Sequence, residues 1–437
     1  MKKILCLSLL FCILACTICI PAYATEPPST VGVGAAVLIN TETGTVIHEH
    51  NADTETSPAA TARLMALLVS YERLSGQMSE RVAITNEMVR PYTSYNSFYI
   101  KSWRNLSDYV GQKVSVEDLF EHALVYSADD ACYALAILAF GDAQTCIAAM
   151  NEKARSLSMT HTEYTAIVSG GSGAKTTARD VSRLASEFSR NTLLLDIASS
   201  ASKSITVGGD SVTVYSRNLF NSTYYGKGYY DSEINGLLSA QSQGVLLSMK
   251  RKENLSYLCV VMNADTSGAS KYPDGREANA YTVSRDLLDF GVENYGYCKV
   301  LSELRVFADI PVTLSKQADF VAAVPSGELL AFLPKSTDVK TEIDYDVHID
   351  YASIEAPVRL GDTVGYVDVI YKGESLGRVK LVTNAAISKS LTLEVTDFAR
   401  RVISYPLTIV LLCASALVGI GYVLYRAQKI SEEKGEE

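Results

Sequence analysis

An uncharged run near the end of the chain limits what this sequence can fold into. Residues 403–425 include no charged side chain, and a helix of that length reaches across the hydrocarbon core of a bilayer. The run has no polar face, which favours a helix that spans the membrane over one that lies along its surface. Basic residues flank it on both sides: Arg400, Arg401, Arg426 and Lys429. We therefore predict a transmembrane helix over residues 403–425 and a cytoplasmic tail over residues 426–437.

The N-terminus has the pattern of a cleavable secretory signal. Two lysines precede an apolar run over residues 4–20, and Ala22-Tyr23-Ala24 fits a small-residue cleavage site. We expect residues 1–24 to be a signal peptide and the folded part to lie outside the cytoplasmic membrane. A lipoprotein signal with Cys16 as the acceptor fits less well, because the bulky Leu14 stands two residues before it.

Length and composition narrow the functional classes. The 437 residues suit two domains with appendages, and the net charge of −10, without a large basic block, argues against nucleic-acid binding. Outside the terminal segments only four cysteines remain, which permits disulfides without requiring them. They are Cys132, Cys146, Cys259 and Cys298. No C-x-x-C pair occurs among them and the histidines are scattered, so we expect neither a metal site nor a cofactor.

The hydrophobic pattern predicts an α+β domain from about residue 30 to residue 297. Residues 33–50 have the alternation of a hairpin, and a second hairpin is predicted where two apolar runs flank Lys250 to Asn254. Helical periodicity follows the first hairpin, with Ser57-Pro58 as a candidate helix start. Further helices are expected over residues 115–139, 142–157, 176–190 and 278–294.

After Cys298 the pattern changes to short strands. Apolar and polar residues alternate strictly from Glu342 to Asp350, which predicts a strand with one wet face. Two apolar runs flank Lys372-Gly373-Glu374 and predict another hairpin. We therefore expect a small all-β domain over residues 298–392.

The first domain resembles the low-molecular-mass penicillin-binding D-alanyl-D-alanine carboxypeptidases, which are serine peptidases with a β-lactamase/transpeptidase-like fold. The similarity rests on three segments: Ala35-Ala36-Val37-Leu38-Ile39-Asn40, which continues to Asn51-Ala52-Asp53; Met150-Asn151-Glu152-Lys153-Ala154; and Asp286-Leu287-Leu288-Asp289-Phe290-Gly291. The resemblance implies an antiparallel sheet packed with helices, then a small β domain and a C-terminal membrane attachment. It also implies that the chain acts on, or near, peptidoglycan.

Such enzymes depend on three motifs, S-x-x-K, S-x-N and K-T-G. A serine at a helix start attacks the peptide carbonyl, and a lysine one turn later can accept its proton. The first motif falls in the segment from Pro58 to Met65, where Ala60 occupies the serine position and Arg63 the lysine position. Alanine has no nucleophile, and arginine stays protonated at physiological pH, so it cannot act as a general base.

The other two motifs are also altered. The second falls at Ser127-Ala128-Asp129, where aspartate replaces asparagine and adds a negative charge. The third falls at Leu238-Ser239-Ala240, where the cation for the substrate carboxylate is lost and the glycine gains a methyl group. Each of these residues also has a structural interpretation. Ala60 and Arg63 suit a helix, Asp129 and Asp130 suit a helix start, and Ser127 can cap a turn.

Other serines match the motifs by letter. Ser200-Ala201-Ser202-Lys203 reads S-x-x-K, but a serine-rich chain gives roughly two such matches by chance, and this one precedes a predicted strand. Ser94-Tyr95-Asn96 matches S-x-N in the same accidental way. Thr61 stands next to the missing nucleophile, but one helical step turns a side chain by about 100°.

Two functional hypotheses follow. Loss of the nucleophile of a serine hydrolase costs on the order of 10⁶-fold in rate, or about 8 kcal/mol, and here all three motifs are altered. The first hypothesis is therefore a catalytically inactive relative, which binds, scaffolds or regulates at the wall. Its partners would be the membrane and a peptidoglycan stem peptide or another wall-synthesis protein. The second hypothesis is an active serine-type carboxypeptidase or related hydrolase with a rewired site.

Overall fold

The computed structural model describes residues 26–92, 105–168, 171–225, 228–404 and 406–433. The predicted signal peptide and the Ser94-Tyr95-Asn96 match lie outside these residues. The chain divides into two compact units. One holds the chain up to Gly296 together with Pro334–Ser336, and the other holds Tyr297–Leu333 and the chain from Thr337 onward.

A five-stranded antiparallel sheet forms the centre of the first unit. Its strands, in spatial order, are β2 (Val46–His50), β1 (Ala35–Asn40), β9 (Leu255–Met262), β8 (Val245–Lys252) and β7 (Ile234–Ala240). The β1–β2 and β8–β9 pairs confirm both predicted hairpins. Every residue of β1 and β9 is buried, because helices cover both faces of the sheet.

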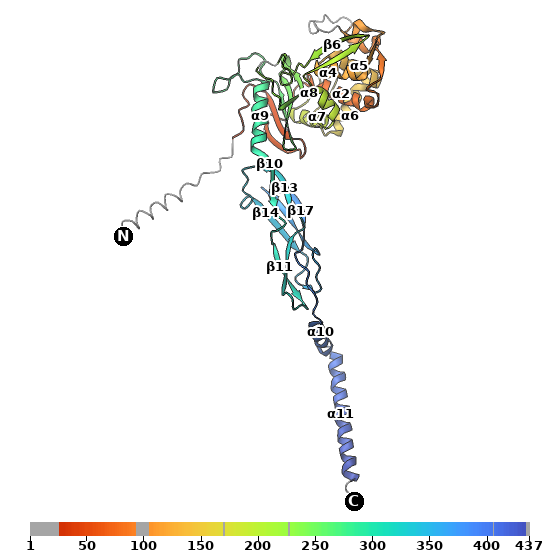
Figure 1. Ribbon diagram of the computed structural model, residues 1–437, viewed down its shortest axis with the longest axis vertical. Helices are drawn as coiled ribbons and strands as arrows, with labels where there is room; N and C mark the ends of the chain where they lie inside the picture. Colours follow the sequence, from red (N-terminus) through yellow and green to blue (C-terminus); the bar gives the residue numbers. More distant parts are fainter. Residues whose placement is uncertain (1–25, 93–104, 169–170, 226–227, 405, 434–437) are drawn as a thin grey trace, which may run out of the picture. The chain divides into compact units, whose positions relative to one another are not determined.

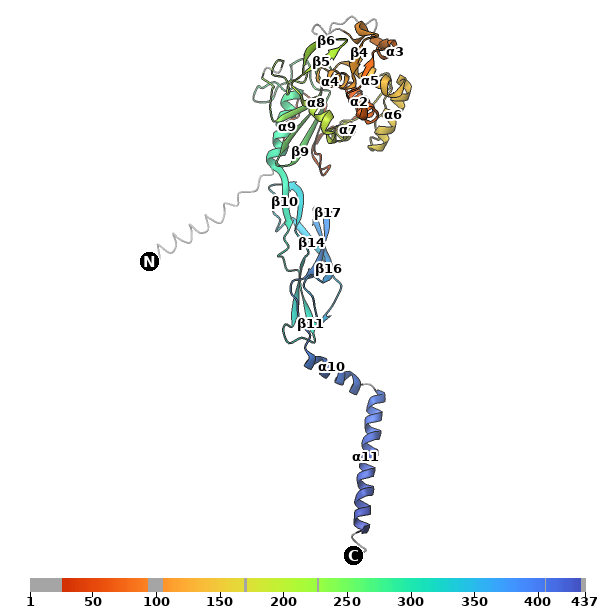
Figure 2. The same cartoon turned by 45° about the vertical axis from the view of Figure 1, so that its right-hand side comes forward.

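Different helices cover the two faces (Figure 1, Figure 2). Helix α9 (Ala280–Asn294) packs on β8 and β9, and Ser284 of this helix lies 2.5 Å from Ser248 of β8. Helices α7 (Ala178–Arg190) and α8 (Thr192–Ser199) cover the other face, where Leu247 joins the main hydrophobic core. Side chains of adjacent residues in a strand point to opposite faces of the sheet. A side chain of β7 therefore points either toward α9 or toward α7 and α8.

The remaining helices extend the core beyond α7 and α8. Most residues of helix α2 (Thr61–Leu74) are buried, and the helix packs against α5 and α6. The others are α3 (Asn86–Val89), α4 (Val116–Val125), α5 (Asp129–Phe140) and α6 (Ala143–Ser156). A four-stranded sheet flanks these helices, in the order β3 (Arg81–Ala83), β4 (Lys113–Ser115), β5 (Ser202–Val207), β6 (Asp210–Tyr215). The predicted α+β class is confirmed.

One detail of the predicted helices was wrong. The helix expected to start at Ser57-Pro58 begins at Thr61, because Ala59 has φ +48° and the preceding residues form a turn. The helical region expected over residues 115–139 holds two helices, and the second begins at Asp129, where a helix start was predicted; Ser127 between them has φ +64°. Left-handed backbone conformations at non-glycine residues end a right-handed helix.

The second unit contains the predicted small all-β domain. Its main sheet has the order β14 (Ile343–Ile349), β16 (Thr363–Tyr371), β17 (Glu374–Thr383), β12 (Phe320–Pro325), β11 (Ala308–Thr313), β15 (Ile354–Glu355). Strands β10 (Tyr295–Leu301) and β13 (Leu329–Pro334) pair separately. The β16–β17 pair confirms the hairpin predicted around Lys372-Gly373-Glu374.

Two helices, α10 (Leu391–Ser404) and α11 (Pro406–Glu433), follow the β-strands. Within α11, Ile409–Ser431 is long and apolar enough to span a membrane. This segment overlaps the span predicted over residues 403–425, whose first residue, Ile403, lies in α10, and the membrane span itself stays a prediction. The proline at the first position of α11 suits a helix start, because its missing N–H would have no partner there.

Candidate functional site

Four of the predicted motif residues lie at the junction of α2, α5 and the loop between α4 and α5. The Arg63 Nη1 atom donates a hydrogen bond to Asp129 Oδ1 at 2.7 Å and another to the Ser127 carbonyl at 3.2 Å. Arg63 stands one turn after Ala60 at the start of α2, so this side chain joins the first motif to the second. The residues that the sequence placed in two motifs are therefore in direct contact.

A tight turn sets the start of α2. The Thr61 N–H and hydroxyl both donate to the Pro58 carbonyl, at 2.9 and 2.6 Å. This bond occupies the Thr61 hydroxyl, which is fully buried. Ala60 follows the strained Ala59 and is 4% exposed. The position predicted for the nucleophile thus carries only the methyl group of Ala60, in a buried turn. The hydroxyl of the neighbouring Thr61 is hydrogen-bonded to the backbone.

Arg63 is buried while its partner is not. The Arg63 side chain is 7% exposed and the Asp129 side chain 44% exposed, and the Arg63 Nε has no hydrogen-bond partner among the described residues. A buried guanidinium needs a counter-charge, because removing a charge from water without one is costly. Asp129 supplies that charge, which explains why an aspartate suits the position where the related motif has asparagine.

The third motif does not place its residues on a common face. Leu238 of β7 is buried in the core on the side of α7 and α8. The Ser239 hydroxyl points to the other face and lies 2.7 Å from the Tyr281 hydroxyl of α9. Burial raises the pKa of Tyr281, so this hydroxyl stays protonated. The sequence placed Ser239 with Ala60, whereas the structure directs its hydroxyl to the α9 side.

Gln243 is a site residue that sequence reasoning missed. It follows β7 in a short 3-10 turn, Gln241–Gln243, and its side-chain Oε1 accepts a hydrogen bond from the Ala60 N–H at 2.9 Å. In serine hydrolases the N–H of the nucleophile commonly helps to bind the oxyanion. In this chain a side-chain oxygen already binds the corresponding N–H. No letter pattern signals this contact, because it joins residues 183 positions apart.

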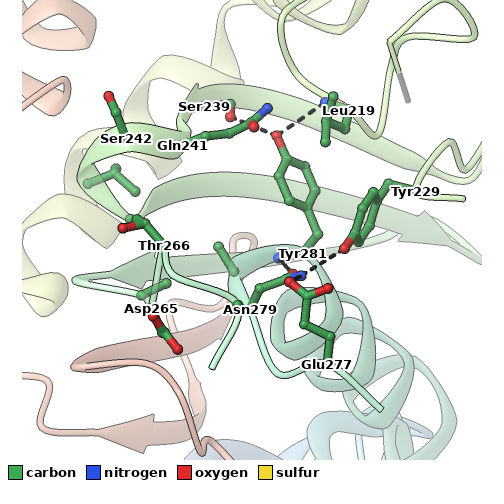
Figure 3. Close-up of a pocket in the computed structure, with 15 residues that line it drawn as sticks. Leu219, Tyr229, Ser239, Gln241, Ser242, Asp265, Thr266, Glu277, Asn279 and Tyr281 are labelled. Atoms are coloured by element: carbon green, nitrogen blue, oxygen red, sulfur yellow. Dashed lines mark hydrogen bonds between the residues drawn. The ribbon is translucent and has the colours of Figure 1, made fainter. Parts of the chain in front are cut away.

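A pocket of about 300 Å³ lies beside β7 (Figure 3). Ser239 lines it, but Ala60, Arg63, Ser127 and Asp129 do not. Tyr281 reaches across the pocket from α9 toward Ser239, with Tyr229, Asn279 and Glu277 beside it. The pocket therefore belongs to the α9 side of the sheet. Sequence reasoning did not find it, because its residues come from separate loops.

The alternative S-x-x-K match has ordinary structural roles. Ser200 ends helix α8, and its hydroxyl donates to the Asp196 carbonyl at 2.7 Å. Lys203 lies in β5 and forms an ion pair with Glu121 at 3.1 Å. The two residues do not share a helix face, so the geometry that lets a lysine accept a proton from a serine one turn away is not formed.

Comparison with known proteins agrees with the sequence resemblance. Residues 22–266 match the family model described as D-alanyl-D-alanine carboxypeptidase. The chain is 24% identical over 383 residues to D-alanyl-D-alanine carboxypeptidase DacD of Salmonella typhimurium, covering 84% of this chain and 89% of that protein. It is 21% identical over 363 residues to D-alanyl-D-alanine carboxypeptidase DacF of Bacillus subtilis, covering 82% and 86%.

The fold is also similar to solved structures. The crystal structure of penicillin-binding protein 6B from Escherichia coli aligns with a TM-score of 0.58 at 20% identity, covering 83% of this chain and 98% of that one. At this identity the likeness establishes the fold, and the predicted β-lactamase/transpeptidase-like architecture is confirmed.

Proposed function

Since the chain belongs to the D-alanyl-D-alanine carboxypeptidase family, we propose that it is a member without peptidase activity, which acts in peptidoglycan metabolism as a binding, scaffolding or regulatory module. The observation that carries the proposal is Ala60 at the position of the nucleophile, with its backbone N–H bound to Gln243. A serine peptidase needs a hydroxyl at that point and a free N–H to receive the oxyanion.

The contacts of Arg63 support the same conclusion. A general base must be able to lose and regain a proton near neutral pH, and a guanidinium cannot. Arg63 is instead held by Asp129 and by the Ser127 carbonyl, in a geometry that suits a structural ion pair. The residue at the position of the base thus binds the residues at the positions of the second serine and the asparagine.

The third motif supplies no cation for a substrate carboxylate. Leu238 stands at that position and packs in the core. A terminal carboxylate that entered the former cleft would meet an apolar side chain on one side and the carboxylate of Asp129 on the other. We therefore infer that the family's carboxylate recognition is absent, and that a partner in the wall is contacted elsewhere on the protein.

Incubation with a penicillin tests the proposal. We expect the intact mass of the full-length protein in detergent to be unchanged after the reaction, because position 60 offers no serine to acylate. Penicillin-binding protein 6B from Escherichia coli serves as the positive control, and release of D-alanine from a D-Ala-D-Ala peptide is measured in parallel. A stable adduct that maps to Ser127, Ser200 or any other serine would instead establish the enzyme hypothesis.

That hypothesis requires a relocated nucleophile. Ser239 is the motif serine that lines a pocket, and its nearest polar neighbour is the Tyr281 hydroxyl. A tyrosine acts as a general base only as a phenolate, and burial raises the pKa of Tyr281. The pair therefore favours a structural hydrogen bond over an activated nucleophile.

We further propose that the mature chain starts at Thr25 and is anchored through α11, with the folded units on the extracytoplasmic side. The leader pattern at the N-terminus and the apolar segment Ile409–Ser431 support this orientation. N-terminal sequencing of the purified protein is expected to begin at Thr25. Protease treatment of intact protoplasts is expected to degrade the folded part, and protection of that part would contradict the orientation.

A further inference from the structure

The pocket beside β7 has the dimensions and lining of a binding site. Its volume of about 300 Å³ lies at the lower end of the range for ligand pockets, which suits a group as large as one amino acid or one sugar. Two tyrosines, Tyr229 and Tyr281, supply aromatic surface, and their ring centroids lie 5.1 Å apart. Ser239 and Thr266 add hydroxyl groups to the wall.

Asn279 holds two of the lining side chains in place (Figure 3). Its Nδ2 donates hydrogen bonds to the Tyr229 hydroxyl at 2.7 Å and to Glu277 Oε1 at 2.9 Å. Its Oδ1 accepts from the N–H groups of Tyr281 and Thr282 and so caps helix α9. All the hydrogen-bonding capacity of this amide is used. The positions of Glu277 and Tyr229 are therefore fixed to the rigid start of a helix before any ligand arrives.

Each of these two side chains keeps one unused hydrogen-bonding position. Glu277 Oε2 makes no hydrogen bond within the described residues, and neither does the proton of the Tyr229 hydroxyl, whose oxygen accepts from Asn279. Glu277 is not needed to cap α9, because Asn279 already does so. An acid that is positioned by a hydrogen bond but keeps an open oxygen is arranged to bind a donor.

The charge of the lining indicates the sign of that donor. Among the described residues of the lining, Asp265 and Glu277 are the charged members, and none is a lysine or an arginine. Hydrogen bonds from Ser267 and Ser270 hold the pKa of Asp265 well below its usual range, so this carboxylate stays ionised. Two carboxylates in the lining contribute a negative potential that attracts a positive group and repels an anion. The face of a tyrosine ring adds to this preference.

We propose that this pocket binds a group that carries a protonated primary amine, with Glu277 as its charge partner and Tyr229 beside it. The amine belongs either to a free small molecule or to a side chain of the wall polymer, and the chemistry of recognition is the same for both. Ala60 and Arg63 do not line this pocket, and the motif residue that does, Ser239, directs its hydroxyl to Tyr281 on the α9 side. The proposal holds whether or not the protein has peptidase activity.

Calorimetric titration of the full-length protein in detergent with Nα-acetyl-L-lysinamide tests the free-ligand case. Saturable binding is expected, and Nα,Nε-diacetyl-L-lysinamide, which has no charge on the ε-nitrogen, is expected not to bind. Glu277→Gln keeps an acceptor for Asn279 but removes the charge, and it should weaken binding about tenfold or more. Glu293→Gln makes the same charge change at the exposed other end of α9 and should leave the affinity unchanged.

Co-sedimentation with purified peptidoglycan tests the polymer case. Pellets are compared before and after acetylation of the wall amines, with the wild type, Glu277→Gln and Glu293→Gln proteins, whose thermal unfolding is measured to verify folding. Binding in either assay that needs both the free amine and Glu277 supports the proposal and identifies the source of the amine. The proposal is overturned if neither assay depends on the amine, or if Glu277→Gln binds as the wild type does. Loss of binding in a folded Arg63→Met variant but not in Glu277→Gln would also overturn it, because the ligand would then occupy the former cleft.

Discussion

The Ala60→Ser/Arg63→Lys double variant is expected to release no measurable D-alanine from a D-Ala-D-Ala peptide. The two substitutions rebuild a nucleophile and a base three positions apart on the first turn of α2. They leave Leu238 in place of a cation and Asp129 near the position of the substrate carboxylate, where it now lacks its arginine partner. Residues that act as a unit contribute non-additively, so a partly rebuilt site gains little of the roughly 10⁶-fold acceleration.

The contact between Gln243 and the Ala60 N–H adds a further obstacle. Its Oε1 accepts from that N–H at 2.9 Å, so an oxyanion would have to displace a neutral acceptor that the protein already provides. One donor to an oxyanion is commonly worth about 10²–10³-fold in rate. We therefore expect that restoration needs Asp129→Asn, Leu238→Lys, Ser239→Thr and Ala240→Gly, together with Gln243→Ala.

The assay is D-alanine release, with penicillin acylation of position 60 as a second readout. Lysine at position 238 enters a site where leucine is 5% exposed, so the thermal unfolding of each variant is compared with that of the wild type. The full set without Leu238→Lys serves as the folded control. If the double variant turns over at a rate near that of working relatives, then the cleft is functional and only the first motif was lost.

Sequence periodicity predicted those elements whose burial pattern is local. The β1–β2 hairpin and helix α9 followed from residues close together in the chain, and the alternation around Ile343–Ile349 predicted β14. Helix boundaries were less accurate where the backbone departs from the usual conformation. Ala59 and Ser127 adopt positive φ, although their side chains carry no signal for it.

The site was predicted only in part, for a related reason. The motif positions located Ala60, Arg63 and Asp129. The structure adds that Arg63 and Asp129 form an ion pair. The direction of Ser239 depends on which face of β7 meets α9, and this is a tertiary feature. Gln243 and the pocket around Asn279 unite segments distant in sequence, so no local pattern could indicate them.

The Gly244→Ala variant is expected to lower the thermal stability of the first unit and to distort the pocket. Gly244 has φ +62°, and an added Cβ would lie 2.3 Å from the Ala264 carbonyl oxygen and 2.5 Å from the Ala264 nitrogen. The left-handed conformation costs a residue with a side chain about 1–2 kcal/mol. The clash is with backbone, and Ala264 cannot move freely because its N–H donates to the Gly244 carbonyl at 2.9 Å.

Gly173→Ala separates the two contributions to that loss. Gly173 has φ +80°, but an added Cβ meets nothing within 4 Å, so it reports the conformational cost alone. Forcing a methyl group into a packed position adds about 1–3 kcal/mol, and we expect Gly244→Ala to unfold at least about 5 °C below Gly173→Ala. Thermal unfolding followed by circular dichroism measures the difference.

Because Gly244, Ala264 and Asp265 line the pocket, the Gly244→Ala variant should also lose affinity for Nα-acetyl-L-lysinamide. Equal unfolding midpoints for the two alanine variants would mean that the turn after β7 relaxes without strain, and that the wall of the pocket is more adaptable than these contacts indicate.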